Sequence, residues 1–234
     1  MYGLATRQSD RDHIRVFANT EILQIFGLEK EDHYVQKVGE DDYNFSELRQ
    51  VLRLLKKGNP GSIELLYNTQ WIEKSEVWGF AIQHRDNLLN SEGYFSALRG
   101  YAQAEIKAAK QVNTGKLGAA RKKVLTEFGF SPKNYVNALR LLNQGAQFFR
   151  DGELKVNLFL SNYPLASQLL ELKTCPANFK QNDLNLMVAD AEKALVRAYE
   201  HRLFRTQFLN SIAEQICLMA YGETISSRFN VFSP

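Results

Sequence analysis

Apolar residues follow two different patterns along this chain, and the pattern changes near residue 45. Before that point, short runs at 2–5, 14–18 and 34–38 favour β-strands and are separated by polar, acidic turns. After it, apolar residues recur at three- and four-residue spacing almost to the end. We therefore predict an α+β protein, with a small mixed-sheet lobe at the N-terminus followed by a larger helical lobe.

Helix end signals divide the second part of the chain. A helical run at 45–55 is stopped by the Gly-Asn-Pro at 58–60, and a Ser-Pro start opens a run at 131–152. The stretch 183–220 holds no Gly or Pro. As one helix it would be roughly 55 Å long, which is longer than a domain of this size is wide. We expect a break within it, at a position that the sequence does not fix.

Composition narrows the class of protein. Hydrophobic residues make up 44% of the 234 residues and charged residues 24%, which is typical of a globular chain rather than a disordered one. No apolar run approaches the roughly 18 residues that would span a bilayer, and the first residues hold no apolar signal segment. Cys175 and Cys217 supply neither a disulfide framework nor zinc-site spacing. We expect a cytoplasmic protein with no membrane partner.

Charge is nearly balanced overall but unevenly placed. The 29 basic and 26 acidic residues give a net charge of +3, which neither predicts nor excludes a nucleic-acid partner. The stretch 107–123 carries basic residues and no acidic one. Such a patch either attracts phosphates or forms a solvated helix face. Its members are Lys107, Lys110, Lys116, Arg121, Lys122 and Lys123.

Ser9-Asp10-Arg11-Asp12 is the most informative tetrapeptide. In a strand, residues two apart share a face, so Asp10 and Asp12 would present both carboxylates on one side. Paired carboxylates repel unless a divalent cation lies between them, and a two-metal phosphoryl-transfer site adds a third carboxylate from a neighbouring strand. With 26 acidic residues such spacing also arises by chance, and a two-Asp turn is the structural alternative. His13 follows the pair, and we expect a surface turn histidine there.

The segment YGLATRQSDRD and the IRVFA that follows resemble the active-site signature of polymerase-β-like nucleotidyltransferases. The likeness is greatest to the predicted nucleotidyltransferase branch associated with RNA-repair ligases, also common in phages, whose members read close to GS-x-x-YGL-ATP-x-SD-x-D-x-x-GV. Segment 42–68 resembles the family's Asp-led strand, the helix after it and its GNP-x-x-x-EL-L motif. Segment 100–109 resembles its GY-x-x-x-Q helix, and segment 133–154 resembles its Lys-x-x-x-His-x-x-Arg-Leu-Leu helix. We expect a phage or bacterial protein.

The resemblance implies a metal site and two lobes. Asp10 and Asp12 would be the first two ligands of Mg²⁺ or Mn²⁺, and Asp42 the third. Asp41 would point to the opposite face of its strand. The implied lobes are an N-terminally incomplete nucleotidyltransferase-like lobe at 1–75 and a helical lobe at 76–234.

The resemblance also implies a nucleotide site. Lys133 and Arg140 lie seven residues apart on one helical face and are candidates for phosphate contact. Alternatively, they are a surface lysine and an arginine packed between lobes. Gly3 would mark the end of the phosphate-binding element, and Ser9 would lie beside the nucleotide.

Several positions depart from the family pattern. The Gly-Ser pair would lie just before Met1 and is absent, which removes donors for the triphosphate. Arg7 replaces a Pro, Arg15 a Gly, and Asn137 the usual His. We expect the chain as written to bind divalent metal weakly and to transfer nucleotide poorly or not at all. A misassigned start, a fragment and a decayed enzyme all remain open.

The function that the resemblance implies is transfer of a nucleoside monophosphate from an NTP to an acceptor hydroxyl. It suggests a nucleic-acid end, RNA especially, as the acceptor, with Arg121, Lys122 and Lys123 as its first contact. Two alternatives are a catalytically inactive binding or regulatory protein on the same fold and a helical interaction protein. We expect the two Trp and fifteen Phe residues to be core and lobe-interface residues rather than base-stacking platforms. The NTP, the acceptor and the oligomeric state cannot be predicted from the sequence.

Overall fold

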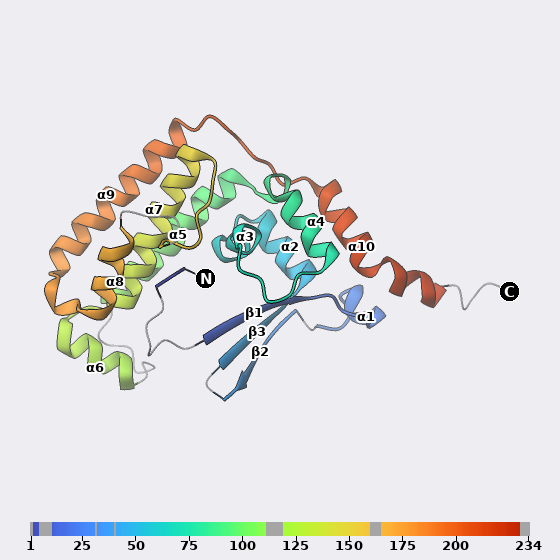
Figure 1. Ribbon diagram of the computed structural model, residues 1–234, viewed down its shortest axis with the longest axis horizontal. Coiled ribbons are helices and arrows are strands. Elements are labelled where there is room, and N and C mark those ends of the chain that lie inside the picture. Colours follow the sequence, from blue (N-terminus) through green and yellow to red (C-terminus); the bar gives the residue numbers. More distant parts are fainter. Residues whose placement is uncertain are drawn as a thin grey trace. The chain divides into compact units, whose positions relative to one another are not determined.

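A computed structural model describes residues 2–4, 11–30, 32–39, 41–110, 119–159 and 165–229, and shows a three-stranded sheet followed by a largely helical chain (Figure 1). This confirms the predicted α+β class. In chain order the elements are β1 (Arg11–Phe17), α1 (Ile22–Ile25), β2 (His33–Val38), β3 (Asp41–Glu47), α2 (Leu48–Lys56), α3 (Pro60–Tyr67), α4 (Glu76–Gln83), η1 (Arg85–Leu88), α5 (Ser91–Lys110), α6 (Ala119–Phe128), α7 (Pro132–Asp151), α8 (Ala166–Thr174), η2 (Pro176–Asn178), α9 (Gln181–Glu200) and α10 (Asn210–Phe229).

The sheet is mixed, with strand order β1-β3-β2. β1 runs parallel to β3, and β2 runs antiparallel to it. Gly39 follows β2 with a φ of +64°, a left-handed conformation that favours glycine and lets the chain reverse toward β3. Successive side chains of each strand point to opposite faces, so every register pair belongs to one face or the other.

Internal contacts divide the chain into two compact units. One, called here the helical unit, comprises Met1–Leu4 and Tyr94–Arg205; the other, called the sheet unit, comprises Ala5–Gly93 and Thr206–Pro234. Tyr2–Leu4, called here the N-terminal tripeptide, thus belongs with the helices, and α10 belongs with the sheet. The predicted lobes at 1–75 and 76–234 stay a prediction.

The core of the sheet unit lies on the apolar stripe of α2. Leu48, Val51, Leu52 and Leu55 are buried along one helix face, as three- and four-residue spacing requires. α10 contributes Ile216, which is fully buried. The helix predicted from residue 45 begins at Leu48 instead, because the preceding residues form β3 and pair with both neighbouring strands.

The core of the helical unit is built around α7. Gly145 in α7 lets neighbouring helices approach closely: a Cβ there would lie 2.4 Å from Leu98 Cδ1 and 3.1 Å from Leu195 Cδ1. Tyr94, Phe148 and Phe149 form a buried aromatic cluster with edge-to-face and tilted ring contacts.

Two expectations about local structure have opposite outcomes. The predicted break in 183–220 is confirmed, because α9 ends at Glu200 and α10 begins at Asn210. The β-run predicted at 2–5 is wrong for the part that is described. Tyr2–Leu4 is irregular, and the Tyr2 carbonyl accepts a hydrogen bond from the Leu158 amide at 3.1 Å. Among the described residues, no helix is both long and apolar enough to cross a membrane.

Candidate active site

Asp12 and Asp42 are direct register partners on neighbouring parallel strands. Their side chains therefore point to the same face of the sheet, and adjacent strands lie roughly 4.8 Å apart. Asp12 is exposed, and the Asp42 side chain is 36% exposed. Two of the three predicted metal ligands are thus brought together by strand pairing. The third, Asp10, lies outside the described residues.

Lys37 shares this face, and sequence reasoning did not single it out. It pairs with Asp42 in the β2–β3 register, and its Nζ lies 4.0 Å from Asp42 Oδ1. The Lys37 side chain is 70% exposed, so the ion pair is screened by water and contributes little to stability. Only the antiparallel register brings this lysine to the carboxylates, and the local sequence carries no signal for that register.

Asp41 belongs to the opposite face. Its Oδ2 lies 3.4 Å from His13 Nε2, and the His13 ring stacks on Tyr43 with centroids 4.5 Å apart. His13 was expected in a surface turn, but it lies within β1 and is partly exposed. Strand alternation thus separates Asp41 from Asp42 although they are adjacent in sequence.

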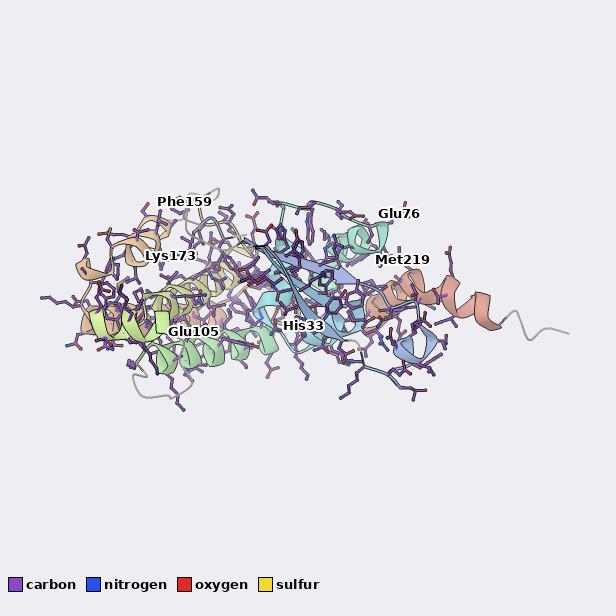
Figure 2. The ribbon with its side chains drawn as sticks, turned by 90° about the horizontal axis from the view of Figure 1, so that it is seen from below. His33, Glu76, Glu105, Phe159, Lys173 and Met219 are labelled. Atoms are coloured by element: carbon purple, nitrogen blue, oxygen red, sulfur yellow. The ribbon has the colours of Figure 1, made fainter. Side chains whose placement is uncertain are left out.

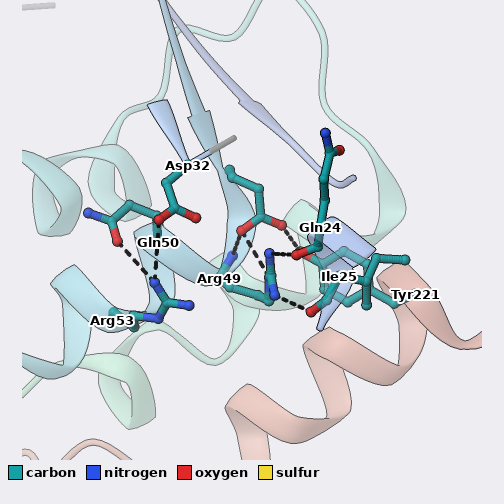
Figure 3. A network of polar contacts seen from close by, with 8 residues as sticks. Gln24, Ile25, Asp32, Arg49, Gln50, Arg53 and Tyr221 are labelled. Carbon is teal, nitrogen blue, oxygen red and sulfur yellow. Dashed lines mark hydrogen bonds and ion pairs between the residues drawn. The ribbon is translucent and has the colours of Figure 1, made fainter. Parts of the chain in front are cut away.

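A buried polar network fixes the end of β3 (Figure 3). Glu47 is fully buried and caps α2 by accepting a hydrogen bond from the Arg49 backbone N at 2.9 Å. Arg49 also forms an ion pair with Glu47 and donates to the carbonyls of Gln24 and Ile25 at the end of α1. The Tyr221 hydroxyl of α10 donates to Glu47. Burial and Glu47 raise the pKa of Tyr221, so this hydroxyl stays protonated.

The donor set on the Asp12 face fits a hard divalent cation. Carboxylate oxygens are the ligands that Mg²⁺ and Mn²⁺ prefer, and exposed carboxylates leave space for a nucleotide's phosphates to complete the coordination. Within the described ranges, no cluster of at least three His, Cys, Asp or Glu side chains is arranged to hold a metal. Asp12 and Asp42 are therefore two members of a candidate site whose predicted third member, Asp10, is not among the described residues.

The predicted nucleotide-binding residues that can be described lie in the helical unit, around Tyr2–Leu4. The Arg140 guanidinium lies 3.7 Å from the Tyr2 ring centroid, and Arg140 is only 6% exposed. Gly3 has a φ of +75°, and a Cβ there would lie 2.6 Å from Asn157 Oδ1. Arg140 is thus packed against Tyr2 in this structure. Position 3 favours glycine because its φ is positive and Asn157 leaves no room for a Cβ.

The two lysines near this segment differ from Arg140. Lys133 is exposed in the first turn of α7. Lys173 in α8, which sequence reasoning missed, donates from Nζ to the Leu4 carbonyl at 2.8 Å. Burial, and then the charge of Lys133, lower the pKa of Lys173. Positive charge therefore gathers beside the N-terminal tripeptide. Ser9 lies outside the described residues.

Asn137, which stands where the family pattern has His, contacts α5. Its Nδ2 lies 3.4 Å from Glu105 Oε1, and Asn134 Nδ2 donates to the same carboxylate. Glu105 stands where the GY-x-x-x-Q pattern has Gln. Figure 2 labels Glu105 and Lys173 among the side chains of the helical unit. Asn137 and Glu105, which both differ from the family pattern, thus contact each other and link α5 to α7, the helix that carries Lys133 and Arg140.

The basic stretch at 107–123 is only partly described. Lys107 and Lys110 are exposed in the last turn of α5, and Lys122 and Lys123 are exposed on α6. Lys116 and the side chain of Arg121 lie outside the described residues. The exposed lysines are compatible both with phosphate contact and with a solvated helix face.

Comparison with known proteins gives one match. The family model described as RlaP, RNA repair pathway DNA polymerase beta family, matches residues 1–203. No curated protein and no solved structure matches the chain. The matched range includes both described carboxylates and the N-terminal tripeptide, and it ends before α10.

Proposed function

Because the chain belongs to the RNA repair pathway DNA polymerase beta family, we propose that it is a metal-dependent nucleotidyltransferase. The reaction would move a nucleoside monophosphate from an NTP to an acceptor hydroxyl and release pyrophosphate. The description of the family supports an RNA end as the acceptor. The observation that carries this proposal is the register pairing of Asp12 with Asp42 on one face of the sheet.

In this proposal Asp10, Asp12 and Asp42 hold Mg²⁺ or Mn²⁺. The bound cation supplies positive charge that offsets the triphosphate and polarises the attacking hydroxyl. Three carboxylates on one face would repel one another in the metal-free protein, and this repulsion favours cation binding. Lys37 partly balances that charge on the β2 side of Asp42.

The helical unit would serve the phosphates. Lys133, exposed at the start of α7, is the proposed phosphate contact, and the positive end of the helix adds to its field. The buried Arg140 would act indirectly, by holding Tyr2 and its neighbour Gly3 in place. Gly3, at the end of the implied phosphate-binding element, keeps its backbone close to the nucleotide in this proposal.

The test replaces each carboxylate by its isosteric amide. Asp10→Asn, Asp12→Asn and Asp42→Asn should each abolish transfer from radiolabelled NTPs to a pool of RNA and DNA acceptors with Mg²⁺ or Mn²⁺. Their stability should be unchanged or slightly higher, because carboxylate repulsion is relieved. The matched control is Asp41→Asn, which changes the adjacent residue on the other face and should retain activity.

Two outcomes would contradict the assignment. Activity that survives all three substitutions would contradict the assigned metal site. An Asp41→Asn variant that loses as much activity as Asp42→Asn would contradict the assignment of the site to one face of the sheet. A titration with Mn²⁺ and NTP separates the enzyme from an inactive binding protein on the same fold. The parent chain should bind Mn²⁺ in the presence of NTP, and Asp42→Asn should bind it more weakly.

A further inference from the structure

The sheet carries a row of stacked rings on the face opposite Asp12 and Asp42. His13 stacks on Tyr43, with ring centroids 4.5 Å apart and an interplanar angle of 11°. Tyr34 stacks on Phe45 at 4.5 Å and 9°, and Tyr43 lies 6.5 Å from Phe45. We call these four rings the aromatic ladder. It crosses β1, β3 and β2 and belongs entirely to the sheet unit.

The ladder is not a packed core. Tyr34 is 40% exposed, the His13 side chain is 28% exposed, and every described residue of β2 is exposed. Phe45 is the buried ring, with Tyr34 stacked on it in register and the Arg15 guanidinium 5.6 Å from its centroid. Three of the four rings carry a polar edge, whereas a sheet face made for burial is rich in aliphatic side chains.

The outer rings of the ladder, His13 and Tyr34, keep part of their surface accessible. β1 and β2 are the outer strands of the described sheet, and each end ring stacks inward on a ring of β3. Tyr34 also contacts the Phe17 ring of β1, with centroids 5.8 Å apart, and both outer rings, His13 and Tyr34, remain partly exposed. A nucleobase is a flat ring that stacks on aromatic side chains whatever its sequence, and a nearby arginine adds attraction for both the base and its phosphate. Asp41, the acidic residue beside the His13 end of the ladder, is already held by His13.

We propose that the aromatic ladder binds unpaired bases of a single-stranded RNA, as a holding site for the acceptor. The inference rests on the proposed function for the choice of RNA. His13 follows Asp12 and Tyr43 follows Asp42, so the ladder and the carboxylates lie back to back on the same two strands. RNA bound on the ladder leaves the carboxylate face open for the NTP. This assigns a role to the half-exposed rings, which the metal site does not use.

Fluorescence anisotropy with a labelled single-stranded RNA of about 12 nucleotides tests the ladder, in EDTA and without NTP. A base–aromatic stack contributes enough that its loss weakens binding about 5- to 100-fold. Tyr34→Leu and Tyr43→Leu should each show such a loss, whereas Tyr34→Phe keeps the ring and should bind within about twofold of the parent chain. Val35→Ala, at an exposed residue of the same strand on the other face, is the matched control and should bind as the parent does.

Because metal and NTP are absent, this experiment is independent of catalysis. Asp12→Asn should bind RNA normally even where it abolishes transfer, so failure of the enzyme and failure of the ladder are distinguishable. Equal binding by the Leu variants, equal affinity for a duplex of the same sequence, or no RNA binding by the parent chain would each overturn the proposal. If a Leu variant does not fold, photocrosslinking of 5-iodouracil RNA to the parent chain decides, with His13 or Tyr34 as the expected site.

Discussion

Replacing Tyr221 by Phe removes one hydroxyl from the buried end of the strand that carries Asp42. That hydroxyl donates to Glu47, which is fully buried, while Tyr221 itself is 3% exposed. The ring stays in place, so the substitution tests the hydrogen bond and not the packing. A phenylalanine at this position leaves the buried carboxylate with one donor fewer, and a buried acceptor that loses a donor costs free energy.

The size of the effect follows from the remaining partners of Glu47. A hydrogen bond to a charged group contributes about 1.5–3 kcal/mol. Glu47 keeps the Arg49 backbone N at 2.9 Å and the Arg49 Nε at 3.2 Å, so its desolvation stays partly compensated. We expect the free energy of unfolding of the sheet unit to fall by about 2 kcal/mol at pH 7. At about 2–4 °C per kcal/mol, this lowers Tm by about 4–8 °C.

Tyr221 should also make the stability of the sheet unit depend on pH in the alkaline range. Burial and Glu47 raise the pKa of Tyr221 above its ordinary value of about 10. Above pH 10 the unfolded chain loses this proton while the folded chain keeps it, so stability falls by about 1.4 kcal/mol per pH unit for each such group. Tyr67 and Cys217 in the same unit also have raised pKa values and keep contributing in the variant. Tyr221→Phe should therefore make the fall of stability with pH shallower by about 1.4 kcal/mol per pH unit, which is the contribution of one group.

Tryptophan fluorescence in urea measures this unit selectively, because both tryptophans of the chain, Trp71 and Trp78, lie in it. Unfolding curves at pH 7 and between pH 10 and 11 give the stability difference and the slope. Tyr34→Phe removes an exposed hydroxyl in the same unit and should change neither. A decrease in stability below about 0.5 kcal/mol, with an alkaline slope equal to that of the parent, would refute the assigned hydrogen bond.

Two further predictions concern the helical unit. Gly145→Ala places a Cβ 2.4 Å from Leu98 Cδ1, and overpacking of about 1–3 kcal/mol exceeds the roughly 1 kcal/mol that alanine gains in a helix. Urea unfolding by circular dichroism should show a net decrease in stability, and a stabilised variant would contradict the packing. Reversing the charges of Arg121, Lys122 and Lys123 should weaken RNA binding and reduce the log–log salt slope by roughly one unit for each phosphate that the variant no longer binds. An unchanged salt slope would show that these three residues form a solvated helix face and do not contact phosphates.

Local periodicity predicted the strand geometry around the carboxylates well. Strand alternation alone predicts that Asp41 and Asp42 point to opposite faces of the sheet. In the structure Asp41 contacts His13 on one face, and Asp42 is in register with Asp12 on the other. The choice of Asp42 also needed the family resemblance, because the pairing of β1 with β3 joins residues far apart in sequence. The same holds for Glu47 and Tyr221, which lie 174 positions apart. Neither residue carries a local signal of its partner.

The helix break at 201–209 shows a different limit of sequence reasoning. Length predicted a break, but the stretch lacks the Gly or Pro that would place it. In the structure Thr206 exchanges backbone and side-chain hydrogen bonds with Ser91, and the Leu209 amide donates to the Asn87 carbonyl. These tertiary bonds replace the intrahelical ones that a continuous helix would make. The break is therefore set by partners more than 100 residues away in sequence.

The orientation of β3 decides which chemistry each face of the sheet carries, and α10 contributes to that orientation. A slip of one residue would move Asp42 to the ladder face and Tyr43 to the carboxylate face. Glu47 shares the ladder face of β3 because it lies five residues after Asp42, and its bonds to Arg49 and Tyr221 hold it there. Tyr221 lies beyond residue 203, where the family match ends. A helix outside the matched range thus helps to keep the carboxylates on the face opposite the aromatic rings.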